Sequence, residues 1–247
     1  MNPALPGLEL PFLPHPSLVE QLSRLGPRVD CLHLSLADPL IHDARPLWSG
    51  PPWDAFLELL AEAHKACPKA LKLVLLNSRF LPPDRYKDQT FLNHLAGRLE
   101  QLAGLNLAQG VVYADLFLLK SLSDHAPDLA GQLVATPSIN CRLDTPAKLA
   151  AQLQALASTA FKPPPRIVAD RSLNRDQGAR RSFYREMHEL LPGADLVLMA
   201  NEGCLPHCPY KDAHDALGAY GRIHAEGADF TPVSRLGCIP RFLEQPW

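Results

Sequence analysis

The sequence predicts one TIM-like (β/α)-barrel domain of parallel strands, in which the barrel is either closed or incomplete. Strand-length apolar segments alternate strictly with helical segments, and the strands are almost continuously apolar, as in sheets covered on both faces. No Gly-rich dinucleotide-binding loop follows the first expected strand, which disfavours an open doubly wound sheet. A length of 247 residues suits a single domain over residues 1–247.

The first strand is expected at residues 29–36, where apolar and polar residues alternate between the flanking pairs Gly26-Pro27 and Asp38-Pro39. The first helix, expected at 53–67, has apolar residues at helical spacing and stops before Pro68, which cannot continue a helix. By the same periodicities, further strands are expected at 71–76, 110–114, 132–136, 166–169 and 195–200, and further helices at 90–103, 116–125, 146–158 and 179–191. After Gly218 the chain is expected to be irregular.

Composition limits the class of protein. Hydrophobic residues make up 47% of the chain and charged residues 20%, as in ordinary globular proteins. The net charge of -2 predicts no general nucleic-acid-binding surface, so an RNA substrate would need a local patch. No apolar run is long enough to span a membrane, and residues 1–17 lack the pattern of a signal peptide. A cytoplasmic protein is therefore expected.

Functional groups in parallel α/β folds lie at the carboxyl ends of the strands. The polar residues just past the expected strands are therefore substrate-binding candidates: Asn77, Asn140, Arg171, Asn174, Arg175 and Asn201. The paired donors of Arg171 and Arg175 can hold a carboxylate or phosphate, although ion pairs with Asp170 or Asp176 fit the same residues.

Two of the six cysteines, Cys204 and Cys208, follow the last expected strand and are separated by three residues. The cytosol keeps thiols reduced, so metal binding is a better explanation than a disulfide framework. Thiolates at this spacing can reach one metal ion or one cluster. Cys238 is a third candidate ligand, and Cys141 is preferred over Cys31 as the fourth because it lies at a strand's carboxyl end. Cys67 is expected to be a small buried residue.

Two residues near this loop are candidates for catalysis. Glu202 can act as a general acid or base, because a carboxylate close to a metal and shielded from water has a perturbed pKa. His214 can serve as a proton donor or as a ligand. Zinc fits a set of cysteines with His214, whereas a four-iron cluster prefers four cysteines. Loop hydrogen bonding is an equally good interpretation of Glu202.

The segment DRSLNRD at 170–176, then NEGC at 201–204 with Cys208-Pro209 and His214, resembles the collagenase-like peptidases, family 32 of unknown catalytic type. The resemblance extends more loosely over Arg45-Pro46, Asn77 and Asn140. It implies a barrel with a cysteine-bound 4Fe-4S cluster. Relatives include proteins for the oxygen-independent hydroxylation of ubiquinone precursors and of RNA bases.

This chain departs from the family pattern at two places. Relatives often have a cysteine just after the second strand, where this sequence reads Asn77-Ser78-Arg79-Phe80. The fourth ligand therefore stays open. The sequence ends at Trp247, near where many relatives continue into a further strand and helix, so a heteromeric partner that completes the barrel is plausible.

The leading hypothesis is an iron–sulfur barrel enzyme or enzyme subunit that modifies a small-molecule or RNA substrate by redox chemistry of the hydroxylation type. A second hypothesis is a metal-dependent or nucleophilic peptidase or hydrolase with Glu202 as base. However, no Gly-x-Ser-x-Gly nucleophile motif is present. A third hypothesis is a scaffold in which the metal only stabilises the fold.

Overall fold

The computed structural model describes residues 6–36, 38, 40–41, 43, 50–200 and 211–223. Strands β1 (Leu8–Phe12), β2 (Val29–Leu34), β3 (Leu71–Leu76), β4 (Gly110–Tyr113) and β5 (Val134–Pro137) form a parallel sheet in chain order. Strands β6 (Arg166–Val168) and β7 (Asp195–Val197) form a second parallel pair. An isolated bridge between Val134 and Lys162 links the region before β6 to β5.

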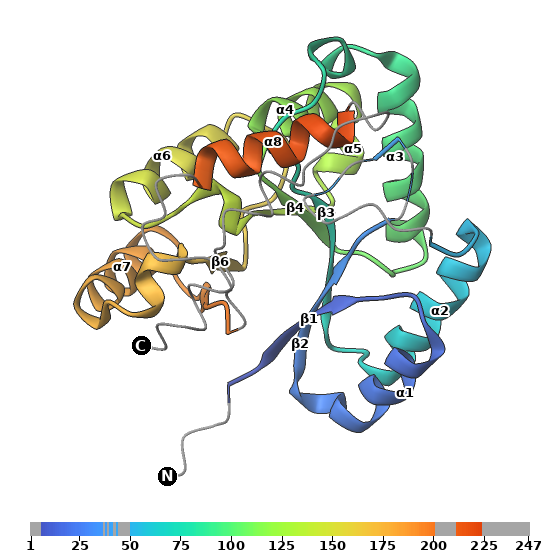
Figure 1. The fold of residues 1–247 in the computed structure, drawn as a ribbon, viewed down its shortest axis with the longest axis horizontal. Coiled ribbons are helices and arrows are strands. Elements are labelled where there is room, and N and C mark those ends of the chain that lie inside the picture. The colour runs from blue at the N-terminus through green and yellow to red at the C-terminus, as the bar shows by residue number, and fades with distance from the viewer. Residues whose placement is uncertain are drawn as a thin grey trace.

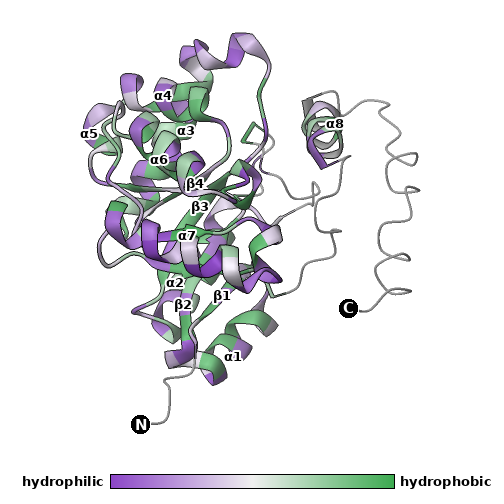
Figure 2. Ribbon diagram, turned by 90° about the vertical axis from the view of Figure 1, so that its left-hand side faces the viewer, coloured by the Kyte–Doolittle hydropathy of each residue, from purple (hydrophilic) through white to green (hydrophobic). Residues whose placement is uncertain are grey.

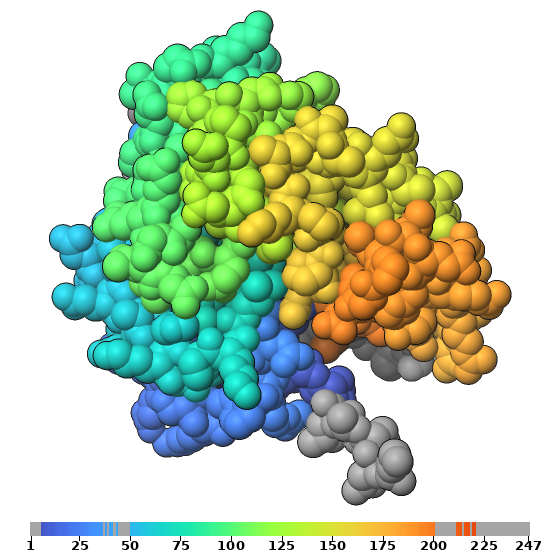
Figure 3. Space-filling view, turned by 180° about the vertical axis from the view of Figure 1, so that it is seen from behind, coloured from blue at the N-terminus to red at the C-terminus, as the bar shows by residue number. Residues whose placement is uncertain are grey.

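The helices that connect the strands follow one another around the outside of the sheet, whereas the last helix lies across it (Figure 1). They are α1 (Pro16–Leu25), α2 (Trp53–Ala66), α3 (Gln89–Gly104), α4 (Leu116–His125), α5 (Pro127–Ala130), α6 (Pro146–Leu156), α7 (Gln177–Leu190) and α8 (Lys211–Ile223). Seen from behind, the successive segments also run around the molecule in sequence order, from α1 and α2 to α6 and α7 (Figure 3). This is the winding of a TIM-like barrel, and it confirms the predicted fold class.

Local sequence explains where several helices begin. The side chains of Asp88, Asp115, Thr145 and Asp176 accept hydrogen bonds from the free backbone N–H groups at the starts of α3, α4, α6 and α7, respectively. These caps place the helix starts immediately after the loops that leave the strands. None of the helices described here is long and apolar enough to cross a membrane.

Buried apolar side chains form three clusters, one of which lies around β6, α6 and α7. The larger core lies between the outer face of the five-stranded sheet and its helices, and it includes Phe12, Phe56 and Leu95. A smaller cluster on the inner face combines Cys31 with Leu73, Leu75 and Val112. Figure 2 shows that green, apolar segments concentrate in the strands, whereas purple segments concentrate on the helices. The inner face of the five-stranded sheet therefore carries packed apolar side chains at Leu73, Leu75 and Val112.

The structure corrects the sequence prediction at both ends of the described chain. The strand expected to be first, residues 29–36, is the second strand, because β1 and α1 precede it. Near the other end, α8 continues past Gly218 to Ile223, where irregular chain was expected. The remaining expected elements are present, with ends that differ by a few residues.

Candidate functional site

The loops that follow β3 and β5 meet over the end of β4, which lies between these strands in the sheet. The side-chain amide of Asn140 donates to the carbonyl oxygen of Asn77 at 3.4 Å, so two predicted substrate-binding residues lie side by side. The Arg79 guanidinium donates to the backbone carbonyl of Asn140. Asn140 is itself buried, and its backbone N–H donates to the Ser138 hydroxyl at 3.2 Å. These contacts fix the loop after β5 on the loop after β3.

Cys141 ends the short 3-10 helix Ile139–Cys141 that follows β5. Its thiol donates to the carbonyl oxygen of Tyr113 at 3.4 Å, so it faces the end of β4. Burial raises the pKa of Cys141 to about 12, although the nearby Arg79 opposes this shift. The next residue, Arg142, has left-handed backbone angles (φ 54°, ψ 53°), which cost free energy for a non-glycine residue.

Asp212, near the start of α8, joins both loops. One carboxylate oxygen accepts from Arg79 at 2.8 Å and the other accepts from Arg142 at 2.6 Å. The hydrogen bond from Arg142 holds the pKa of Asp212 below its usual value. We call Arg79, Arg142 and Asp212 the arginine clamp. It places the start of α8 beside Cys141, and Figure 1 shows α8 in red across the sheet.

Removal of the clamp carboxylate is expected to release α8 locally. In Asp212→Asn, amide hydrogen exchange in residues 211–223 should speed up about 3- to 10-fold, because partly exposed ion pairs contribute about 1 kcal/mol together. The global free energy of unfolding should change little. Because the pKa of Asp212 is lowered from its ordinary value of 3.8 in the folded state, the clamp contributes fully above that value and is lost as the pH falls through the folded value.

Exchange measured by mass spectrometry tests this expectation. Asp124→Asn is the matched control, since it removes one partner of the exposed Lys120–Asp124 pair on α4 and touches none of the clamp. Unchanged exchange in α8 of Asp212→Asn would show that the clamp does not hold the helix.

The predicted anion-binding residues after β6 lie in a capped 3-10 turn. Arg171 to Asn174 form a 3-10 helix, and the Asp170 side chain caps it by accepting from the Ser172 N–H at 2.9 Å. The Asn174 amide donates to the Met199 carbonyl at 2.8 Å and so ties this turn to the chain after β7. Asn174 thus has a structural contact at the predicted site. For Arg171 and Arg175, substrate binding remains a prediction.

The loop after β5 also contacts the loop after β6. The backbone N–H of Asp170 donates to the Leu143 carbonyl at 3.0 Å. The charges of Arg142 and Asp170 lie close enough to interact. Asn77, Asn140, Cys141 and Asp170 consequently belong to one continuous rim at the carboxyl ends of β3, β5 and β6.

Tyr86 and Asp115 form a hydrogen-bonded pair at the carboxyl end of β4 that was not among the predicted site residues. The Tyr86 hydroxyl donates to the Asp115 carboxylate at 2.5 Å, and Asp115 also caps α4. Burial and this hydrogen bond raise the pKa of Tyr86 to about 12, and burial raises the pKa of Asp115. The exposed ring of Phe117 meets the ring of Tyr86 edge-on. The only sequence signal was the position of Asp115 just past β4.

Several predicted site residues fall outside the described residues: Asn201, Glu202, Cys204, Cys208 and Cys238. His214 lies in α8, but its side chain is outside the description. The residues that are described define a (β/α)-barrel protein in which polar side chains and Cys141 gather at the carboxyl ends of the strands.

Among solved structures, this fold is similar to that of the U32 peptidase Mk0906, with a TM-score of 0.63 and 15% sequence identity. The match covers 96% of this chain and 84% of that chain. At this identity the similarity shows the fold. No family model matches the chain, and no curated protein is significantly similar to it.

Proposed function

We propose that the chain is an iron–sulfur barrel protein, in which Cys141, Cys204, Cys208 and Cys238 hold a 4Fe-4S cluster at the carboxyl ends of the strands. The observation that carries this proposal is the arginine clamp. It attaches the helix that directly follows the cysteine loop to the loop that contains Cys141.

Chain connectivity supports this ligand set. Asp212 binds Arg142, the neighbour of Cys141, at 2.6 Å. Cys208 is only four residues before Asp212, and four residues of extended chain span at most about 14 Å. Cys208 and Cys141 can therefore reach a common metal centre, although they are 67 positions apart in the sequence.

The donor chemistry of Cys141 fits such a centre. Its sulfur is shielded in a loop that backbone hydrogen bonds hold, with the Cys141 N–H donating to the Ser138 carbonyl at 2.8 Å. A cluster would take the thiolate form of the residue, and the nearby Arg79 favours a negative charge there. When bound, a cluster supplies single electrons, which suits redox modification of a small-molecule or RNA substrate. Asn77 and Asn140 would then hold substrate polar groups.

A peptidase remains the alternative, because the similar solved structure is called a U32 peptidase. That name applies to the other protein. In this chain a nucleophilic role for Cys141 is disfavoured, since a reactive cysteine needs a lowered pKa and burial raises that of Cys141. The other form of this alternative is a zinc hydrolase that uses Glu202 as general base. Such an enzyme would contain no iron, so metal analysis distinguishes it from the proposed cluster protein.

Anaerobic purification, followed by absorption spectroscopy and by iron, sulfide and zinc analysis, tests the proposal. The unaltered chain should contain close to four irons and four sulfides, as the cluster's formula requires. Each of Cys141→Ala, Cys204→Ala and Cys208→Ala should lower the iron content at least about 10-fold, because a four-iron cluster uses every ligand.

Cys67→Ala is the matched control. Its thiol is buried and donates to the Leu22 carbonyl in the core between α1 and α2, so its loss should leave the iron content unchanged. A lack of iron would contradict the cluster, and zinc that is lost in Cys204→Ala and Cys208→Ala would favour a hydrolase or a scaffold. A full iron content in Cys141→Ala would remove Cys141 from the ligand set.

A further inference from the structure

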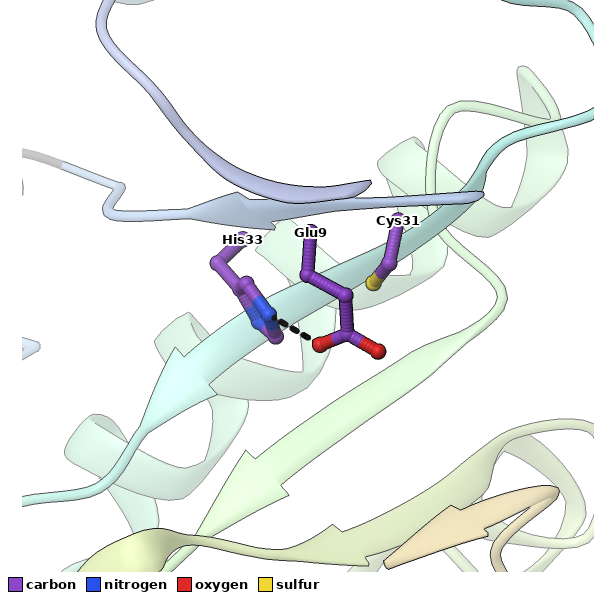
Figure 4. Close-up of side chains that lie close together, drawn as sticks. All are labelled: Glu9, Cys31 and His33. Atoms are coloured by element: carbon purple, nitrogen blue, oxygen red, sulfur yellow. Dashed lines mark hydrogen bonds and ion pairs between the residues drawn. The ribbon is translucent and has the colours of Figure 1, made fainter. Parts of the chain in front are cut away.

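A separate group of metal-binding side chains lies inside the barrel. Glu9 on β1 and Cys31 and His33 on β2 each offer one ligand atom, and these atoms all lie within 4.8 Å of one another (Figure 4). Residues 31 and 33 are two positions apart on β2, so both side chains point to the same, inner face of the sheet. Glu9 is the register partner of Cys31 on the adjacent strand.

Arg166 on β6 completes this group from the other side of the barrel. Its guanidinium donates to one Glu9 oxygen at 2.5 Å, whereas the other Glu9 oxygen lies 2.8 Å from the His33 ring nitrogen Nε2. The Glu9 and Arg166 side chains are only 13% and 11% exposed, respectively, which shields the pair from solvent. Arg166 thereby fixes the Glu9 carboxylate with its second oxygen directed at His33. Oriented carboxylates of this kind are typical of metal ligands.

We propose that Glu9, Cys31 and His33 bind a divalent cation, and that zinc is the ion that best fits them. Carboxylate, thiolate and imidazole are all common zinc ligands, whereas calcium and magnesium prefer sets made of oxygen atoms alone. Zinc–ligand bonds of about 2.0–2.3 Å place tetrahedral ligand atoms about 3.3–3.7 Å apart. The observed spacing, from 2.8 Å to at most 4.8 Å, brackets this range, so side-chain rotations of about 1 Å suffice.

The charge balance also suits a divalent ion. On binding, the Cys31 thiol gives its proton to solvent and contributes a thiolate, while Glu9 contributes a carboxylate. Two anionic ligands neutralise the two charges of the ion. Arg166 keeps its hydrogen bond to Glu9, and both Arg166 and Lys72 lie close enough to Cys31 for their positive charges to favour its thiolate. Without an ion, the same site holds a neutral thiol.

The position of this site separates it from the rim where the cluster is proposed. Glu9 and Arg166 stand at or next to the first residues of β1 and β6, and Cys31 lies in the first half of β2. Glu9, Cys31 and Arg166 are therefore in the amino-terminal half of the barrel, where residues contribute to stability, and His33 is the fifth of the six residues of β2. Known TIM barrels have their active sites at the carboxyl-terminal face. A cation here would join β1 to β2 and, through Arg166, to β6. Its expected role is structural.

Cobalt(II) in place of zinc tests the proposal, because a cobalt–thiolate bond absorbs strongly in the near ultraviolet. The test uses the full chain with Cys204→Ala and Cys208→Ala, so that the loop cysteines cannot contribute and failure of the cluster proposal has no effect. One equivalent of cobalt should produce the thiolate band, and one equivalent of zinc should abolish it. Zinc should also raise the melting temperature.

Cys31→Ser should eliminate the band, and Cys67→Ser, the matched control for a buried thiol, should retain it. His33→Gln should weaken cobalt binding at least about 10-fold, and Arg166→Lys should weaken it about 10- to 100-fold while leaving the ligands in place. Circular dichroism confirms that each variant is folded. If the band is absent in the parent chain, or persists in Cys31→Ser, the proposal is wrong.

Discussion

Glu9→Ala is expected to lower the free energy of unfolding by about 3–5 kcal/mol, because it leaves the guanidinium of Arg166 buried without its carboxylate. The pair links residues that are 157 positions apart and is mostly shielded from water. Few single substitutions on the surface of a protein have such an effect. Urea unfolding of chelator-treated protein measures the loss without any contribution from a bound metal.

A double-mutant cycle assigns this loss to the pair. Arg166→Met removes the positive charge and keeps an apolar side chain, so the combination with Glu9→Ala should be less destabilised than the sum of the two single variants by at least about 1 kcal/mol. Glu20→Ala and Arg24→Ala serve as controls, because each breaks the exposed Arg24–Glu20 ion pair on α1. Each should lower the free energy of unfolding by less than about 1 kcal/mol. Additive losses at Glu9 and Arg166 would contradict a direct coupling.

The Glu9–Arg166 pair also predicts that the free energy of unfolding falls in acid. Burial alone would raise the pKa of Glu9, but the contacts with His33 and Arg166 outweigh it, so the pKa lies below its ordinary value. The unfolded chain therefore binds the Glu9 proton at a higher pH than the folded chain does. The stabilisation is complete above about pH 4.5 and is lost as the pH falls through the folded value. Glu9→Gln should flatten this part of the stability curve.

Phe56→Ala is expected to cost about 3–5 kcal/mol, which is typical for removal of a buried phenylalanine. The Phe56 ring is 1% exposed. It meets Phe12 edge-on at 5.8 Å between ring centroids and stacks on Trp53 at 5.2 Å, so its loss opens a cavity between β1 and α2. Urea or thermal unfolding measures this loss.

Phe117→Ala is the matched control for the phenylalanine. That ring is 76% exposed and touches Tyr86 only edge-on, so the substitution should change the free energy of unfolding by less than about 1 kcal/mol. Equal effects of the two substitutions would mean that Phe56 does not support the packing of β1 on α2.

The alternation of strands and helices from β2 onward was predictable, because each buried strand is almost continuously apolar and each helix carries a local apolar periodicity. Strand β1 was missed for a physical reason. It contains Pro11, which lacks a ladder donor, and Glu9, a charge on the inner face. Arg166 and His33 compensate that charge, and no local pattern reveals partners so distant in the sequence.

Helix α1 did leave a readable signal. His15 caps the helix, Pro16 occupies its first turn, and Leu18 and Leu22 follow at helical spacing. The proline-rich composition of the first residues concealed it.

The candidate site was predictable only in part. The rule that functional groups follow parallel strands located Asn77, Asn140 and Cys141, and the structure places these on one rim. The arginine clamp was not predictable, because Asp212 lies on a helix that is 70 residues or more from either arginine in the sequence. Ion pairs of this kind depend on tertiary packing and leave no periodic pattern.

The link between Glu9 and Arg166 has a consequence for biosynthesis. A ribosome adds about 5–20 residues per second, so the 157 positions between the two side chains take about 10–30 s to synthesise. During that time the Glu9 carboxylate lacks its guanidinium, and the inner face of the emerging sheet stays incomplete. Glu9 on β1 therefore gains its partner on β6 only after most of the chain has been synthesised.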